Sequence, residues 1–138
     1  MSWSPDGSRL AFGCLPLGLA EEKICTVALD GSSFARLVQD GATNPSWSPD
    51  GSRILFTQGG SELTPSVMNV DGSGSRPIGV DFQGQSGGWI GNTRVLISEL
   101  SCSNWYGCFS QGISSVQLDG AARVRLTFGQ DVSPAWRP

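Results

Sequence analysis

The chain has 138 residues, which is the usual size of one domain, and 9 basic against 12 acidic residues give it a net charge of −3. This balance shows no basic stripe, so a nucleic-acid partner is not expected. The sequence has no histidine. This excludes a Ser-His-Asp triad, a Cys-His pair and a histidine-ligated zinc site built from this chain alone, and we expect no metal and no cofactor.

The first segment of the chain occurs twice. Residues 2–12 (SWSPDGSRLAF) return at 46–56 as SWSPDGSRILF, and weaker copies follow at 87–97 (GGWIGNTRVLI) and 133–138 (SPAWRP). Two further sequence markers recur with the same period. An Asp-Gly pair ends an apolar strand pattern three times, and an arginine-led segment follows each pair. A period of about 40–45 residues indicates an array of similar units.

Each unit is predicted to contain four short antiparallel strands. The first strand ends in a turn whose aspartate and glycine are Asp6 and Gly7 in the first copy and Asp50 and Gly51 in the second. Four such strands in a unit of this length are typical of a β-propeller blade. We therefore predict an all-β fold, a partial β-propeller, with blades at about 1–43, 44–85 and 86–130. Residues 131–138 are predicted to form the first strand of a further blade.

The tryptophans that lead the copies are Trp3, Trp47, Trp89 and Trp136. One copy per unit suits packing between blades better than a single ligand site. The aspartates and glycines of the turns are likewise interpreted as structural residues. In the third copy, Ile90-Gly91-Asn92 replaces Ser-Pro-Asp-Gly, so we expect that turn to be built differently.

The Trp-Ser-Pro-Asp-Gly-Ser-Arg segment, the Asp-Gly strand ends and the closing Arg-Leu-Thr together resemble the TolB-type (WD40-like, PD40) propeller repeat. The resemblance covers nearly the whole chain. It implies a propeller, usually of six blades, in exported or periplasmic bacterial proteins. It implies little about chemistry, because the repeated residues are structural and the fold hosts many functions.

Four cysteines form two local pairs, Cys14 with Cys25 and Cys102 with Cys108, each beside a loop that a disulfide would restrain. We favour two disulfides over free thiols. With the resemblance, this points to a periplasmic or extracellular location. No apolar run reaches the length of about 18 residues that a membrane span needs. Met1 leads straight into the predicted first strand, so we expect no signal peptide in this chain, which would then be mature, truncated or cytosolic.

The loops between second and third strands are expected on one face of the propeller, at about 15–23, 58–63 and 98–110. Irregular loops on a regular scaffold are where binding residues concentrate. Trp105, Tyr106 and Phe109 in the last loop, with Leu17 in the first, are the predicted contact patch. The alternative is that these aromatics pack only against their own loop.

Three units do not close a propeller ring, so either further blades or self-association is expected to cover the open faces. We predict no enzyme activity for this chain, since Gly-x-Ser-x-Gly is absent as well as histidine. The predicted function is a non-enzymatic scaffold that recognises a protein, a peptide or a glycan. The alternative is the substrate-gating propeller of a prolyl oligopeptidase-type serine peptidase whose hydrolase domain lies outside this chain.

Overall fold

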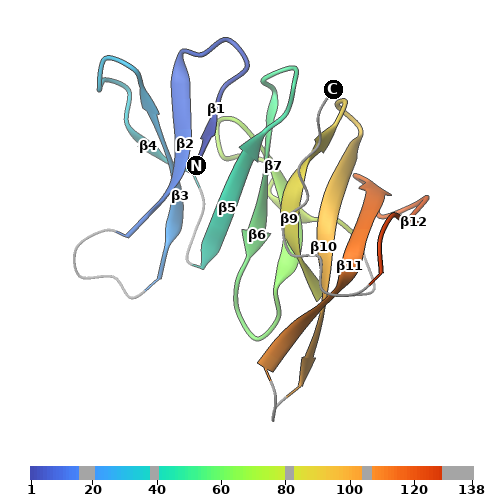
Figure 1. The fold of residues 1–138 in the computed structure, drawn as a ribbon. Helices are drawn as coiled ribbons and strands as arrows, with labels where there is room; N and C mark the ends of the chain where they lie inside the picture. The colour runs from blue at the N-terminus through green and yellow to red at the C-terminus, as the bar shows by residue number, and fades with distance from the viewer. Residues whose placement is uncertain (16–20, 38–40, 80–82, 104–106, 129–138) are drawn as a thin grey trace.

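The computed structural model describes residues 1–15, 21–37, 41–79, 83–103 and 107–128. Twelve strands in these ranges form three four-stranded antiparallel sheets, and within each sheet the strands are neighbours in chain order (Figure 1). This confirms the predicted partial β-propeller of three blades. The first strand predicted for a further blade, at 131–138, lies outside the described residues.

Each sheet takes its strands from one of the repeated units. The first blade contains β1 (Ser2–Trp3), β2 (Arg9–Cys14), β3 (Lys23–Ala28) and β4 (Ala35–Arg36). The second contains β5 (Ala42–Trp47), β6 (Arg53–Gln58), β7 (Thr64–Asn69) and β8 (Arg76–Pro77). The third contains β9 (Gln83–Ile90), β10 (Arg94–Ser103), β11 (Gly107–Gln117) and β12 (Val124–Arg125). The outermost strand of each blade is thus only two residues long.

The turn after the first strand of blades one and two explains why its sequence is repeated so closely. In blade two, the Ser48 hydroxyl donates to Asp50 at 2.6 Å and accepts the Arg53 amide at 2.9 Å. Asp50 also accepts the Ser52 amide at 3.0 Å, and Gly51 has a φ of 71°. The same bonds recur in blade one. The repeated polar residues therefore form hydrogen bonds with one another within the turn.

The third blade makes this turn in another way, as its divergent sequence suggests. Ile90 pairs with Arg94, so only residues 91–93 connect β9 to β10, whereas the corresponding pair in blade one is Trp3 with Leu10. The Asn92 side chain reaches the neighbouring blade and accepts the Asp50 amide at 3.1 Å. A bond between blades therefore takes the place of the bonds within the turn.

Two apolar clusters hold the blades together, one at each junction. The cluster between blades one and two is built around Trp47, with Ile54, Phe56 and Met68 from the second blade against Ala11 and Ile24 from the first. The cluster between blades two and three is built around Trp89. Each tryptophan packs toward the preceding blade, which places both clusters between sheets rather than within one.

One predicted loop is largely strand. The expectation of a loop at 98–110 was wrong, because β10 continues to Ser103 and β11 starts at Gly107. The register shifts at Glu99 and Leu100, where a β-bulge accommodates the extra residue Gln111. Beyond the bulge, pairing resumes up to Ser103 and Gly107. The serine-rich sequence is typical of a loop, but here the cross-strand ladder supplies its backbone hydrogen bonds.

Candidate binding site

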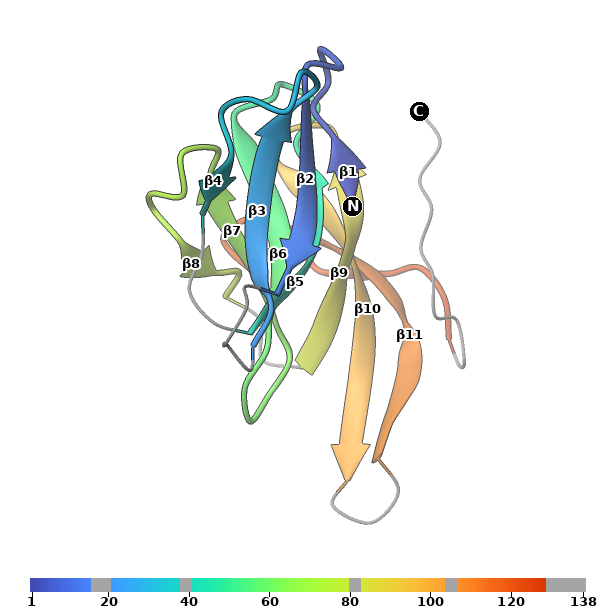
Figure 2. The ribbon, with the colours of Figure 1, turned by 90° about the vertical axis from the view of Figure 1, so that its left-hand side faces the viewer.

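The β10–β11 hairpin extends past the ends of the other two blades (Figures 1 and 2). We call its projecting part, residues 100–103 and 107–110, the β10–β11 arm. Cys102 and Cys108 face each other in the ladder and form a disulfide across the arm. Phe109 lies on the arm with 44% of its surface exposed. Trp105, Tyr106 and Leu17, the other members of the predicted patch, lie outside the described residues.

A buried carboxylate fixes the base of the arm. Glu99 is only 3% exposed, and its Oε1 accepts a short hydrogen bond from Ser114 and one of 2.8 Å from Arg123. The Arg125 guanidinium lies 3.1 Å from Glu99 Oε2. Two arginines from the outer edge of the blade therefore compensate one buried charge, as burial of a carboxylate requires.

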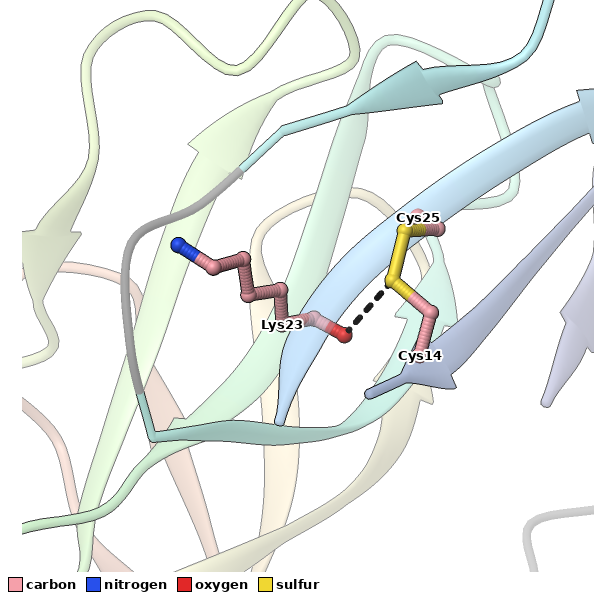
Figure 3. The surroundings of a disulfide bond; sticks show 3 residues. All are labelled: Cys14, Lys23 and Cys25. Carbon is pink, nitrogen blue, oxygen red and sulfur yellow. Dashed lines mark hydrogen bonds between the residues drawn. A yellow bond between two sulfur atoms is a disulfide. The ribbon is translucent and has the colours of Figure 1, made fainter. Parts of the chain in front are cut away.

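The second predicted disulfide lies in the first blade. Cys14, at the end of β2, is bonded to Cys25 in β3, and its Sγ lies 3.5 Å from the Lys23 carbonyl oxygen (Figure 3). Cys25 is fully buried. Both predicted cysteine pairs are thus at disulfide distance, and none of the cysteines is free. Each bridge joins the second and third strands of its blade.

The repeated tryptophans differ in their surroundings. Trp47 and Trp89 are 8% and 7% exposed, whereas Trp3 in the first blade is 54% exposed. Trp89 donates its indole N–H to the Ser46 carbonyl at 2.9 Å. The same group of Trp47 is buried without a partner in the described part of the chain. Trp136 lies outside the described residues.

The turn aspartates carry charge well below neutral pH. The Ser48 hydroxyl, the Ser52 amide and the Ser52 hydroxyl all donate to Asp50 and lower its pKa to about 2. Hydrogen bonds from Ser4 and Ser8 lower the pKa of Asp6 to about 2 in the same way. Ser73 lowers the pKa of Asp71. These bonds favour the ionised forms, so the turn face of blades one and two carries fixed negative charges.

A groove with a volume of about 660 Å³ opens between blades one and two on this turn face. Its apolar lining includes Pro5, Ala35, Leu37, Trp47 and Val70, and its polar lining includes Asp6, Arg9, Asp50 and Asp71. The repeated turns gave no indication of this groove. The arginine-led segments align Arg36 with Arg76, and only the strand register shows that Ala35 is the residue equivalent to Arg76.

Within the described ranges, no three or more cysteine, aspartate or glutamate side chains are grouped so that they could hold a metal ion. The same ranges contain no helix of the length and apolarity that crossing a membrane requires.

No protein-family model matches the chain, and no curated protein sequence matches it. Solved structures do. A TolB-type protein from Agrobacterium tumefaciens aligns over 93% of this chain and 49% of its own length, with a TM-score of 0.76 and 19% identity. TolB from Acinetobacter baumannii aligns over 92% of this chain and 31% of its own, with a TM-score of 0.70 and 19% identity.

Peptidases are also among the similar structures. The acylaminoacyl peptidase of Pyrococcus horikoshii aligns over 91% of this chain and 26% of its own length, with a TM-score of 0.58 and 14% identity. This chain thus spans at most about half the length of these three proteins. At such identities the likeness concerns the fold. The described residues have the fold of three consecutive blades of a TolB-like β-propeller.

Proposed function

We propose that this chain is a non-enzymatic scaffold that binds a protein or peptide through the loop face of its propeller. The β10–β11 arm is the observation that carries the proposal. It projects from the third blade, a disulfide restrains it, and Phe109 exposes 44% of its surface there. Exposed aromatic residues on a rigid support lose little conformational entropy on binding, which makes them effective contact residues.

Trp105, Tyr106 and Leu17 complete the proposed contact patch. In the sequence, Trp105 and Tyr106 stand between the two strands of the arm, and Leu17 stands between the second and third strands of the first blade. A cluster of aromatic residues of this kind is the usual energetic centre of a protein interface. The two disulfides agree with an oxidising compartment, and we propose a periplasmic or extracellular location.

A photocrosslinking experiment tests this proposal. Benzoylphenylalanine replaces Phe109 in one variant and exposed Leu29 in another, and crosslinked products are identified by mass spectrometry in extracts of the source organism. We expect one partner to be captured from position 109 and not from position 29. Replacing Trp105, Tyr106 and Phe109 with alanine should weaken binding of that purified partner at least tenfold. A control triple variant of the exposed residues Leu29, Val124 and Leu126 should not change it.

If the arm variant binds every captured partner as tightly as the control variant, the arm is not a binding surface. Circular dichroism and melting temperature establish that both triple variants are folded. Capture of a glycan-bearing molecule whose binding is lost on deglycosylation would instead assign the patch to sugar recognition.

A second candidate function follows from the peptidase structures that share the fold. In that case the chain is the propeller of a serine peptidase, and its catalytic domain is encoded elsewhere. The gene region answers this directly: a downstream α/β-hydrolase domain in the same reading frame, with a nucleophile elbow, would favour the peptidase over the scaffold.

A further inference from the structure

We propose that the groove between blades one and two binds an arginine side chain of a protein or peptide partner. The groove lies on the turn face, whereas the arm projects from the opposite face (Figure 1). The proposal is thus independent of the arm. It depends on the way in which the neighbouring junction, between blades two and three, is closed.

Strand register identifies equivalent positions in the blades. Ala35 pairs with Thr26 in the first blade, Arg76 with Val67 in the second, and Val124 with Ser115 in the third. Arg76 reaches across the junction to blade three and donates to the Leu118 carbonyl at 2.8 Å. Ala35 has no side chain that could make the same crossing. The groove lies beside Ala35. At the equivalent position of the next junction, the long side chain of Arg76 crosses between the blades.

The residue that accepts the hydrogen bond of Arg76 also has an equivalent at the junction between blades one and two. Leu118 immediately precedes the Asp119-Gly120 turn, and Val70 immediately precedes the Asp71-Gly72 turn. Val70 and Asp71 both line the groove. A guanidinium that enters from outside would therefore meet the residue that corresponds to the acceptor of Arg76. The internal repeat thus supplies a template for the ligand chemistry.

The lining of the groove suits both the methylene groups and the guanidinium of an arginine side chain. Leu37, Trp47 and Val70 offer apolar surface for the methylene groups. Three carboxylates, those of Asp6, Asp50 and Asp71, stand against one guanidinium, that of Arg9. The Arg9 guanidinium is already held within its own blade, where it donates to Thr26 Oγ1 at 3.2 Å and to the Ser33 carbonyl at 3.1 Å.

Two observations argue for a ligand rather than for an accidental gap. The volume of about 660 Å³ lies within the range of about 300–1,000 Å³ typical of binding pockets. Trp47 lines the groove, and its buried indole N–H lacks a partner in the described part of the chain, although the indole N–H of Trp89 has one. Among the described residues, the junction that Arg76 crosses thus satisfies the indole N–H of its tryptophan, whereas the junction with the groove does not.

A peptide titration followed by NMR tests the proposal. The protein is labelled with ¹⁵N, and acetyl-Gly-Arg-Gly-amide is added while the amides of Val70 and Asp71 and the indole N–H of Trp47 are observed. We expect saturable shifts with a dissociation constant in the millimolar range. The matched peptide with citrulline, which has the same shape without the charge, should bind at least tenfold more weakly.

Two variants localise the binding. Ala35→Arg should fill the groove as Arg76 fills the next junction, and should weaken peptide binding at least tenfold. Val124→Arg makes the same change at the equivalent position of blade three and should leave binding unchanged. If Ala35→Arg does not fold, Asp71→Asn serves instead, since asparagine can still accept the Ser73 amide; it should weaken binding about threefold.

Three results would overturn the proposal: no saturable shifts with the arginine peptide, equal affinity for the citrulline peptide, or undiminished affinity in Ala35→Arg. The triple alanine variant of the arm separates the two sites. It should retain binding of the arginine peptide, because the arm and the groove lie on opposite faces.

Discussion

Ser48 shows how a single side chain can hold a turn and set the charge of its neighbour. It is 1% exposed, accepts the Arg53 amide and donates to Asp50. Replacing it with alanine leaves the Arg53 amide without this acceptor, and we expect a loss of about 1 kcal/mol of folding stability. Urea unfolding of Ser48→Ala measures the loss. Ser61→Ala, at an exposed position, is a suitable control.

The same substitution should change the pH dependence of stability. The pKa of Asp50 is about 2 in the folded chain and about 3.8 ordinarily, so its contribution to stability is present above pH 4 and is lost as the pH falls toward 2. Ser48→Ala removes the largest cause of the shift and should raise the pKa of Asp50 toward 3.8. Carboxyl ¹³C NMR measures this pKa. Ser4→Ala should instead raise the pKa of Asp6, and an equal effect on Asp50 would contradict this explanation.

At the scale of the element, the arm and its base are stabilised separately. Glu99→Gln removes the charge that compensates Arg123 and Arg125, and the buried amide cannot accept all of their bonds. We expect a loss of about 3 kcal/mol, the lower end of the range for a broken buried pair, since both arginines are partly exposed. Chemical denaturation measures it, with the exposed Glu62→Gln as control. A loss equal to that of the control would refute a structural role for the cluster.

The disulfide of the arm encloses a short loop, since Cys102 and Cys108 have a sequence separation of 6. Chain-entropy arguments give such a bridge about 2 kcal/mol of stabilisation. Because the bridge lies beyond the bulge, we expect Cys102→Ser with Cys108→Ser to increase amide exchange in the arm while leaving β10 unchanged near Val95. Hydrogen exchange resolved by residue checks this. Equal acceleration along the whole of β10 would show that the arm and the blade are one cooperative unit.

These elements also show what the sequence could and could not predict. The Ser-Pro-Asp-Gly turn was predictable because its hydrogen bonds join residues within five positions of one another. The arm was not, since its strands depend on a register that a bulge displaces at Glu99. The groove was not predicted either. It depends on the difference between Ala35 and Arg76, in strands so short that periodicity does not reveal them.

At the scale of the whole molecule, the Asp-Gly turns also set the distance between blades. A Cβ added at Gly72 would lie 2.5 Å from the Leu37 carbonyl oxygen of the preceding blade, and one at Gly120 would overlap the Gly79 carbonyl. At Gly31 it would meet no atom within 4 Å. All three glycines have φ between 80° and 86°. The cost of placing alanine in this backbone region, about 1–2 kcal/mol, is therefore common to the three positions.

This makes the three glycines a matched series. We expect Gly31→Ala to reduce folding stability only by the backbone cost that is common to the three positions. Gly72→Ala and Gly120→Ala should reduce folding stability by about 1–3 kcal/mol more than Gly31→Ala, because the blades must move apart. Thermal and urea unfolding of the three variants measure the difference. Three equal losses would mean that the turns do not determine the spacing of the blades.

The two junctions between blades are unequal, and this has a mechanical consequence. Between blades two and three, Arg76, Asn92 and Trp89 each make a hydrogen bond across the junction. Between blades one and two, Trp47 donates its backbone N–H to the Ser2 hydroxyl at 3.2 Å, the Gly41 and Ala42 amides donate to the Glu22 carbonyl, and the groove lies beside Trp47. Under a pulling force applied at the two ends, the first blade should detach as a unit before the other two separate. In optical tweezers this gives two rupture events, and an Ala35→Arg variant should raise the force of the first without changing the second.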